Sequence, residues 1–191
     1  MQERTVHRKI GCLRLPCSVA TFAPMNPLQA LAAVAAPFGI AISSAEPIEI
    51  GTALPAVTAK DQDDKEVKLA ETAAKGWALV YFYPKADTPG CTKQACSLRD
   101  SFAVLTEKKV QVFGASLDDA AAQKAFQQKY KLPFTLLADK GGKVADAFGV
   151  PHSMGFAKRQ AFLFKDGKLV WRDLSASTDQ QAADVLKEIG E

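Results

Sequence analysis

Apolar and polar positions alternate with recognisable periods from residue 46 onward. The strongest signal is an almost continuous run of β-branched and aromatic residues from Trp77 to Pro84. Such a run predicts a central strand that is buried on both faces, and the proline ends it because proline cannot donate to a β-ladder. Polar turns at 61–64 and 165–168 predict a hairpin near each end of this region. The other predicted strands span 53–60, 66–71, 110–117, 134–139, 160–164 and 169–174.

Helical periods lie between these strands. Short helices are predicted at 119–131, 143–150 and 178–189. A longer helix is predicted to begin after an N-cap at Thr88, with an apolar stripe that extends to Leu105. The alternation predicts an α/β fold: a mixed central sheet flanked by helices on both faces, with an N-terminal β-hairpin. In such sheets a functional site lies beyond the carboxyl ends of the strands, which here is the segment YPKADTPGC.

Residues 1–45 differ from the rest of the chain. A basic stretch is followed by an apolar segment and then by small residues, which is the order of a secretory signal, with Ala45 at a suitable cleavage position. We therefore expect a leader at 1–45, directing export, and a folded domain at 46–191. Three alternatives stay open: an organelle transit peptide, an uncleaved anchor, or a true start at Met25 or later, which would leave a cytoplasmic protein.

The formal net charge of +3 is carried by this leader, since the remainder of the chain is neutral overall. The domain is therefore expected to offer no basic face and to have no nucleic-acid partner. With 48% hydrophobic and 24% charged residues, the composition is that of a soluble globular protein. We expect no membrane partner for the mature domain and a monomeric chain. Flavin, haem and nucleotide motifs are missing from the sequence, so we expect no cofactor.

Four cysteines form two pairs with the same spacing: Cys12 with Cys17, and Cys91 with Cys96. Two such pairs could supply a four-thiolate zinc site. We expect no metal, because the first pair lies in a leader that cleavage would remove. For the second pair the possibilities are core filling, a structural disulfide and a reactive pair.

Cys91 lies in the first turn of its predicted helix, where unpaired backbone N–H groups and the positive end of the helix dipole stabilise a thiolate. The neighbouring Thr88, Pro89 and Gly90 are cap and turn residues, which disfavours core filling. Cys96 follows five residues later, so the two Cα atoms of an intact helix are about 8–9 Å apart, whereas a disulfide needs about 4.4–6.8 Å. What remains is a reactive pair that can bond only after the helix unwinds locally, as when a sulfenic acid on Cys91 condenses with Cys96.

The segment YFYPKADTPGCTKQAC resembles the active-site segment of the peroxiredoxins, and more closely that of the Q-type, also called bacterioferritin comigratory protein. The family's proline, threonine and cysteine pattern is matched by Pro84, Thr88 and Cys91. Its resolving cysteine is matched by Cys96, and its later arginine, which precedes an apolar strand, by Arg159. The likeness covers residues 46–191.

This resemblance implies a thioredoxin-like fold and a thiol peroxidase. The enzyme would reduce hydrogen peroxide and organic hydroperoxides and would be recycled by thioredoxin or a similar dithiol. Cys91 would be the nucleophile and Cys96 the resolving thiol. Thr88 would hydrogen-bond the peroxide and Pro84 would shield the pocket. Arg159 would supply positive charge for the thiolate and for the oxygens.

Gln94 departs from the glutamate that many peroxiredoxins carry, so a role in orienting an arginine is an open question; glutamine accepts a hydrogen bond but adds no charge. We expect Arg99 to be a solvated helix residue and His152 to be a loop residue, which disfavours a Cys–His hydrolase. Two other functions stay open. One is a thioredoxin-like disulfide carrier, although the Cys-x-x-Cys spacing is missing from the sequence, and the other is a peroxide-sensing redox relay.

Overall fold

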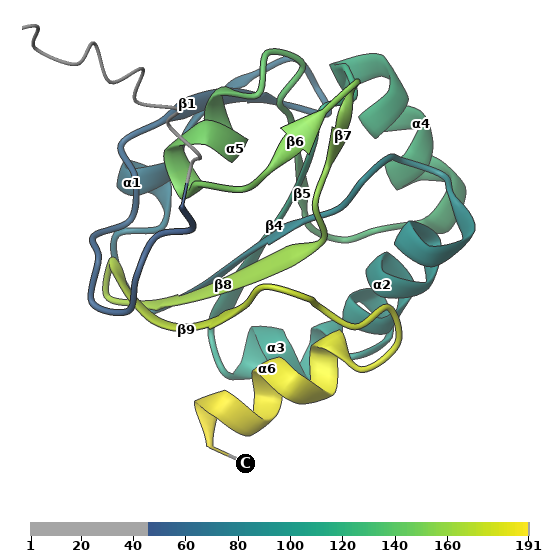
Figure 1. The fold of residues 1–191 in the computed structure, drawn as a ribbon. Helices are drawn as coiled ribbons and strands as arrows, with labels where there is room; N and C mark the ends of the chain where they lie inside the picture. Colours follow the sequence, from purple (N-terminus) through teal and green to yellow (C-terminus); the bar gives the residue numbers. More distant parts are fainter. Residues whose placement is uncertain (1–45, 191) are drawn as a thin grey trace, which may run out of the picture. The chain divides into compact units, whose positions relative to one another are not determined.

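The computed structural model describes residues 46–190, which are built around a seven-stranded sheet of order β2-β1-β5-β4-β3-β8-β9 (Figure 1). Its strands are β1 (Thr58–Asp61), β2 (Glu66–Lys68), β3 (Trp77–Phe82), β4 (Val110–Ser116), β5 (Thr135–Ala138), β8 (Gln160–Lys165) and β9 (Lys168–Asp173). The helices are α1 (Leu69–Thr72), α2 (Pro89–Asp100), α3 (Phe102–Glu107), α4 (Ala120–Tyr130), α5 (Lys143–Phe148) and α6 (Gln181–Ile189). A separate small hairpin pairs β6 (His152–Ser153) with β7 (Phe156–Ala157).

The sheet is mixed, as predicted. β4 runs parallel to both β3 and β5, while the remaining neighbours are antiparallel. β1 and β2 form the predicted N-terminal hairpin, and β8 and β9 the predicted closing one. The carboxyl end of the parallel strand β3 leads directly into α2, so the structure confirms the strand–helix junction that the sequence indicated.

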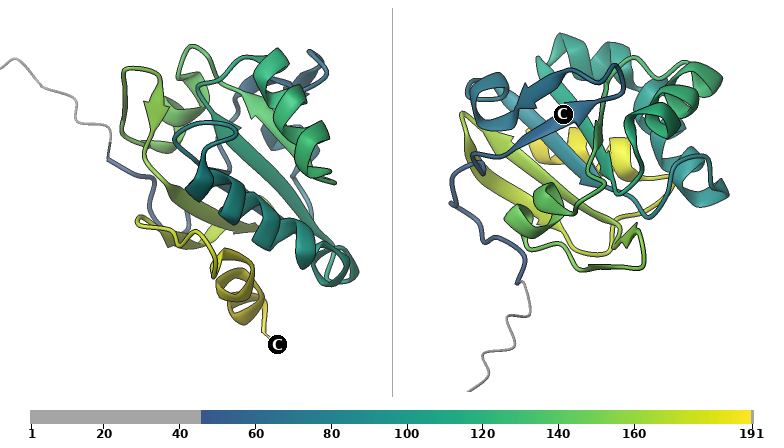
Figure 2. Two further views of the ribbon diagram at one scale, coloured as in Figure 1. Left: turned by 90° about the vertical axis from the view of Figure 1, so that its right-hand side faces the viewer. Right: turned by 90° about the horizontal axis from the view of Figure 1, so that it is seen from above.

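The two faces of β3 pack against different helices, because successive side chains of a strand point to opposite sides. Leu79 and Tyr81 are buried on the face covered by α2, α3, α4 and α6. Val80 and Phe82 are buried on the other face, which α1 and α5 cover together with the segment before β1. Figure 2 shows these layers from two further sides. The continuous apolar run is therefore explained by burial on both faces, and it fixes the strand that carries the site.

Several predicted boundaries are wrong. The strand predicted at 53–60 begins only at Thr58, because Pro55 cannot donate to a β-ladder. The last helix, predicted from 178, begins at Gln181.

The helix predicted from Thr88 to Leu105 is divided at Ser101, whose backbone (φ −94°, ψ 6°) ends α2 and begins α3. Asp100 and Ser101 are weak helix formers whose side chains compete for backbone hydrogen bonds, so the apolar stripe continues while the helix breaks.

The second strand of the N-terminal hairpin is also shorter than predicted, because residues from Leu69 onward form α1. Leu69 and Ala73 are buried whereas Glu71, midway between them, is exposed. A strand would place all three side chains on one face, whereas a helix turns Glu71 away from the other two. The hairpin β6–β7 was not predicted, since strands of two residues give no readable alternation. Met154 and Gly155 make its turn with positive φ angles of 50° and 81°.

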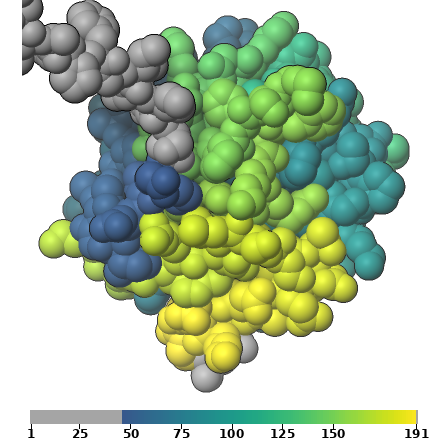
Figure 3. All heavy atoms as spheres, viewed as in Figure 1, coloured from purple at the N-terminus to yellow at the C-terminus, as the bar shows by residue number. Residues whose placement is uncertain are grey.

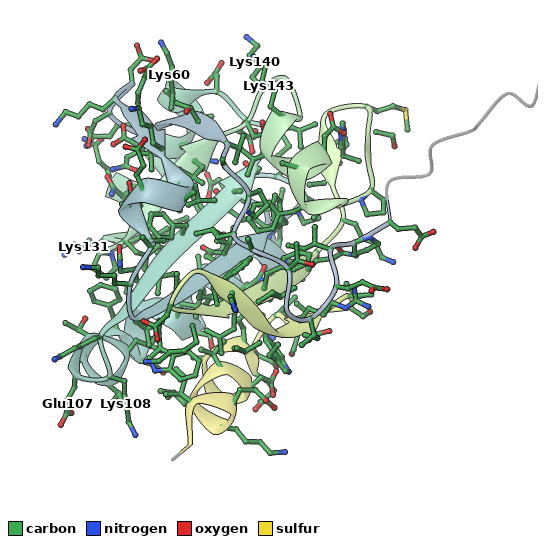
Figure 4. The ribbon with its side chains drawn as sticks, turned by 90° about the vertical axis from the view of Figure 1, so that its left-hand side faces the viewer. Lys60, Glu107, Lys108, Lys131, Lys140 and Lys143 are labelled. Carbon is green, nitrogen blue, oxygen red and sulfur yellow. The ribbon has the colours of Figure 1, made fainter. Side chains whose placement is uncertain are left out.

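The predicted leader at 1–45, with Cys12 and Cys17, lies outside the described residues. Within 46–190, each helix is too short or too polar to cross a membrane. Charged side chains project from separate elements in Figure 4, where Lys60 extends from β1, Lys143 from α5, and Lys131 from the end of α4. The space-filling view in Figure 3 shows the C-terminal segment, in yellow, on the lower part of one face, below the green segment that precedes it.

Candidate active site

The loop that follows β3 is held by two aspartates that sequence analysis did not single out. Asp118 accepts a hydrogen bond from the backbone N–H of Ala86 at 2.7 Å. Asp87 accepts one from Lys129 Nζ and one from Tyr130 Oη, both at 2.7 Å, at the end of α4. The hydrogen bond from Lys129, followed by that from Tyr130, holds the pKa of the Asp87 carboxyl below its ordinary range. Asp87 has φ +57°, a left-handed conformation that aspartate tolerates, so the loop is fixed from both sides.

The start of α2 agrees with the sequence prediction. Thr88 is the N-cap residue, with extended backbone angles, and Pro89 occupies the first helical position. The Thr88 hydroxyl donates to the carbonyl of Lys85 at 3.0 Å, so it ties the loop together instead of capping the helix. Cys91 is the third helical residue and is 2% exposed. Its sulfur therefore lies at the positive end of α2, in a nearly closed environment.

Arg159 reaches this sulfur from a distant part of the sequence. It immediately precedes β8, and the antiparallel pairing of Gln160 with Phe82 places it beside the end of β3. The Nη2 atom of Arg159 donates to Cys91 Sγ at 3.3 Å. Gly90 leaves room for this approach, because a Cβ there would lie 3.3 Å from Nη2 and the guanidinium would have to shift by a few tenths of an ångström. Cys91 and Arg159, which were predicted separately, thus meet across 68 residues of sequence.

Gln94 answers the question that the sequence left open. Its Oε1 accepts a hydrogen bond from Nη1 of Arg159, and its Nε2 donates to Oε1 of Gln181 at the start of α6. Gln94 and Gln181 are both buried. A neutral amide therefore fixes the arginine, whose charge is not balanced by a carboxylate at that position. Gln181 was missed, although a polar residue on the buried face of α6, four residues before the buried Val185, is a readable signal.

Cys96 lies on the same helix but is not brought to the Cys91 sulfur. It is half-buried, and it lines a separate pocket of about 320 Å³. The other residues of that pocket are Asp87, Pro89, Thr92, Lys93, Lys129 and Tyr130. Among the described residues both Cys91 and Cys96 are free thiols. This agrees with the spacing of a wound helix, which keeps the two sulfurs from bonding.

Pro84 is half-buried just after β3 and lines a shallow pocket of about 390 Å³. The other side of this pocket is formed by Pro151 and by residues of the β6–β7 hairpin that follows it, among them Phe156. Arg99 donates to the carbonyl of Tyr130 at 2.9 Å and pairs with Asp100, which is a structural role. His152, which was expected in a loop, begins β6, and its Nε2 atom lies 3.0 Å from Oδ1 of Asp146.

Within residues 46–190 there is no cluster of three or more histidine, cysteine or acidic side chains that could hold a metal ion. The site is built instead from one thiol, one guanidinium and two amides. Such a set can stabilise an anionic sulfur and negative charge on a small bound molecule.

Comparison with known proteins gives a consistent result. The model of the AhpC/TSA family matches residues 50–172. A protein named "Peroxiredoxin Q, chloroplastic" from Suaeda salsa is 40% identical over 152 residues, which are 80% of this chain and 66% of that protein. Its namesake from Triticum aestivum is 44% identical over 142 residues, 74% of this chain and 61% of that protein. The chain thus spans less than two thirds of the length of these curated relatives.

Solved structures that resemble this chain have similar names. Peroxidoxin BcpB from Mycobacterium tuberculosis superimposes with a TM-score of 0.70 at 30% identity, covering 74% of this chain and 96% of that protein. Bacterioferritin comigratory protein from Xanthomonas campestris, at 22% identity and a TM-score of 0.66, shares the fold. The thioredoxin-like fold is thereby confirmed, and the chain belongs to the AhpC/TSA family, among relatives that are Q-type peroxiredoxins.

Proposed function

We propose that this chain is a thiol peroxidase with Cys91 as its nucleophile and Cys96 as its resolving thiol. The observation that carries the proposal is the 3.3 Å contact between Arg159 Nη2 and Cys91 Sγ at the N-terminal end of α2. A guanidinium beside a sulfur at the positive end of a helix stabilises the thiolate, which is the nucleophilic form of cysteine. The family membership and the relatives named peroxiredoxin Q support the same activity.

In the first step the Cys91 thiolate attacks one oxygen of a hydroperoxide, and the O–O bond breaks. The sulfur keeps the attacked oxygen as a sulfenic acid. The other oxygen leaves as an alkoxide or hydroxide and takes a proton, which gives an alcohol or water. Arg159 stabilises the charge that develops on these oxygens. Because the Thr88 hydroxyl already donates to Lys85, its oxygen is available to accept the hydrogen of the peroxide. Pro84 shields the reacting sulfur.

In the second step the Cys96 sulfur attacks the Cys91 sulfur, the S–O bond breaks, and the hydroxide leaves as water with the proton of Cys96. The disulfide requires residues between the two cysteines to unwind, because α2 holds both sulfurs apart. A dithiol of the thioredoxin type then returns two electrons and two protons. The substrates are hydrogen peroxide and organic hydroperoxides, and the chain acts as a monomer.

The proposal is tested by following peroxide consumption in two variants. Cys91→Ser should lose all reaction with peroxide, since the nucleophile is gone. Cys96→Ser should consume one peroxide per chain and stop with Cys91 oxidised, because only the resolving step is lost. Equal loss of the first oxidation in both variants would contradict the separate roles. A redox relay or a disulfide carrier would be favoured instead if the native protein, supplied with thioredoxin, consumed no more than one peroxide per chain.

We further propose that residues 1–45 form a targeting segment that is separate from the domain at 46–191. The sequence order favoured export, but the plant relatives are named chloroplastic, which supports an organelle address among the alternatives. The N-terminal residue of the mature protein from its source, and the compartment where it is found, decide between these destinations.

A further inference from the structure

The segment that must unwind for disulfide formation contains a buried glutamine with two partners on other elements. Gln94 lies between the two cysteines of α2 and is fully buried. It connects Arg159, before β8, to Gln181, the first residue of α6. When the turns between Cys91 and Cys96 unwind, Gln94 has to leave both partners. Its hydrogen bonds therefore favour the wound form of α2.

Helix α6 lies beside α2 (Figure 2), and residues at its start and just before it make further contacts with α2. Ser97 Oγ donates to the carbonyl of Asp179 at 3.3 Å, and it accepts from the N–H of Ala182 at 3.5 Å. Lys93 lies 4.0 Å from Asp179 on the exposed side. Among these contacts, the hydrogen bond between Gln94 and Gln181 joins two buried side chains, and Gln94 lies in the segment that unwinds.

Gln181 uses only its oxygen in this contact. Within residues 46–190 its Nε2 atom is buried without a hydrogen-bond partner. A glutamine placed for packing alone would not need the buried amide, since a leucine or methionine fills a similar volume without an unpaired donor. What the position requires is an acceptor for Gln94 Nε2.

We infer that Gln181 is a positioning residue that holds α2 in its wound form through its hydrogen bond with Gln94. We call this hydrogen bond the latch. Its strength sets the rate at which Cys96 reaches the oxidised Cys91. The inference rests on the proposed function for its chemical consequence. While Gln94 and Gln181 are hydrogen-bonded, α2 stays wound, and Arg159 and the start of α2 hold the Cys91 sulfur in the arrangement that reacts with peroxide. When this hydrogen bond breaks and α2 unwinds, the Cys91 sulfenic acid condenses with Cys96 and releases water. A stronger hydrogen bond between Gln94 and Gln181 leaves the sulfenic acid exposed longer to a second hydrogen peroxide. That peroxide would oxidise the sulfenic acid to a sulfinic acid and would itself be reduced to water.

Three substitutions separate this role from simple packing. Gln181→Met keeps the volume and removes the acceptor, whereas Gln181→Glu keeps the acceptor and makes it charged, which strengthens the hydrogen bond. If Gln181 only filled space, methionine would be tolerated and a buried glutamate would loosen α6. Gln180→Ala is the matched control, because Gln180 is the exposed neighbour of the same residue type.

The first measurement uses the reduced full-length chain and no peroxide. Amide hydrogen exchange of residues 92–96 should be roughly 2- to 12-fold faster in Gln181→Met, the factor that corresponds to one net hydrogen bond, slower in Gln181→Glu, and unchanged in Gln180→Ala. Exchange at 183–189 reports whether α6 stays docked. Faster exchange of 92–96 in Gln181→Glu, or no change in Gln181→Met, would overturn the latch whether or not the protein is a peroxidase.

The second measurement follows disulfide formation after one equivalent of hydrogen peroxide, with acid quenching and mass spectrometry. The rate of conversion of the sulfenic acid to the disulfide should fall in the order Gln181→Met, native, Gln181→Glu. The reverse order, or three equal rates, contradicts the latch. If the native protein forms no sulfenic acid at Cys91, the proposed function fails and with it this consequence, while the exchange measurement judges the latch independently.

Discussion

Replacing Arg159 by alanine removes the one cation that contacts the Cys91 sulfur in the described part of the chain. A hydrogen bond to a charged group contributes about 1.5–3 kcal/mol net. If the contact persists in the transition state of peroxide attack, its loss should slow that step by about 10- to 150-fold. The rate of Arg159→Lys should lie between the rates of the native protein and of Arg159→Ala, because one ammonium group cannot contact Cys91 and Gln94 together as the guanidinium does.

Two rates measure the effect. The rate of Cys91 oxidation is followed by stopped flow with excess peroxide, and thiolate reactivity by alkylation with iodoacetamide at a fixed neutral pH. Both should fall in Arg159→Ala, since the variant lacks the guanidinium contact that stabilises negative charge on the sulfur and on the reacting oxygens. Arg99→Ala is the control, because it removes the same charge from the same protein without touching the sulfur. Native rates in Arg159→Ala, or an equal decrease in Arg99→Ala, would show that the guanidinium of Arg159 does not assist the Cys91 sulfur.

Three further predictions follow from the loop, the helix start and the leader. Gly90→Ala should slow peroxide reduction several-fold without lowering the melting temperature, because the new Cβ would lie 3.3 Å from Arg159 Nη2 while alanine favours the helix; an unchanged rate would mean that the guanidinium yields freely. Asp87→Asn should be less stable to urea than the native protein above pH 4, and the difference in stability should vanish as pH falls. The reason is that a carboxylate whose folded pKa lies below 3.8 stabilises the fold only while it is ionised. A difference in stability that grows in acid would contradict this prediction. Deleting residues 1–45 should leave peroxidase activity intact, whereas loss of folding would place that segment inside the domain.

Local patterns were sufficient for the parts of the fold that depend on neighbouring residues. The run from Trp77 to Pro84 predicted β3 because burial on both faces selects apolar residues without alternation. Thr88 and Pro89 predicted the start of α2 because capping is a property of a few adjacent residues. Cys91 was placed at the positive end of that helix by the same reasoning.

The contacts that complete the site are not local, and this is why the sequence did not reveal them. Gln181 meets Gln94 across 87 residues, and Asp118 meets Ala86 across 32. Glutamines and aspartates are mostly exposed in proteins. The helical period could place Gln181 on the buried face of α6, but it does not show which distant residue Gln181 meets. The break at Ser101 was missed for a related reason, since the apolar stripe continues through it.

If Cys91 reacts first with peroxide and Cys96 then joins it, both thiols should be found in one disulfide after a single turnover. The reduced full-length chain is treated with one equivalent of hydrogen peroxide and digested, and its thiols are mapped by mass spectrometry. We expect one peroxide consumed per chain and a peptide pair joined by a Cys91–Cys96 disulfide, with the loss of two hydrogen atoms. A disulfide that does not include Cys91, or a Cys91 that remains fully reduced while the peroxide persists, would contradict this expectation.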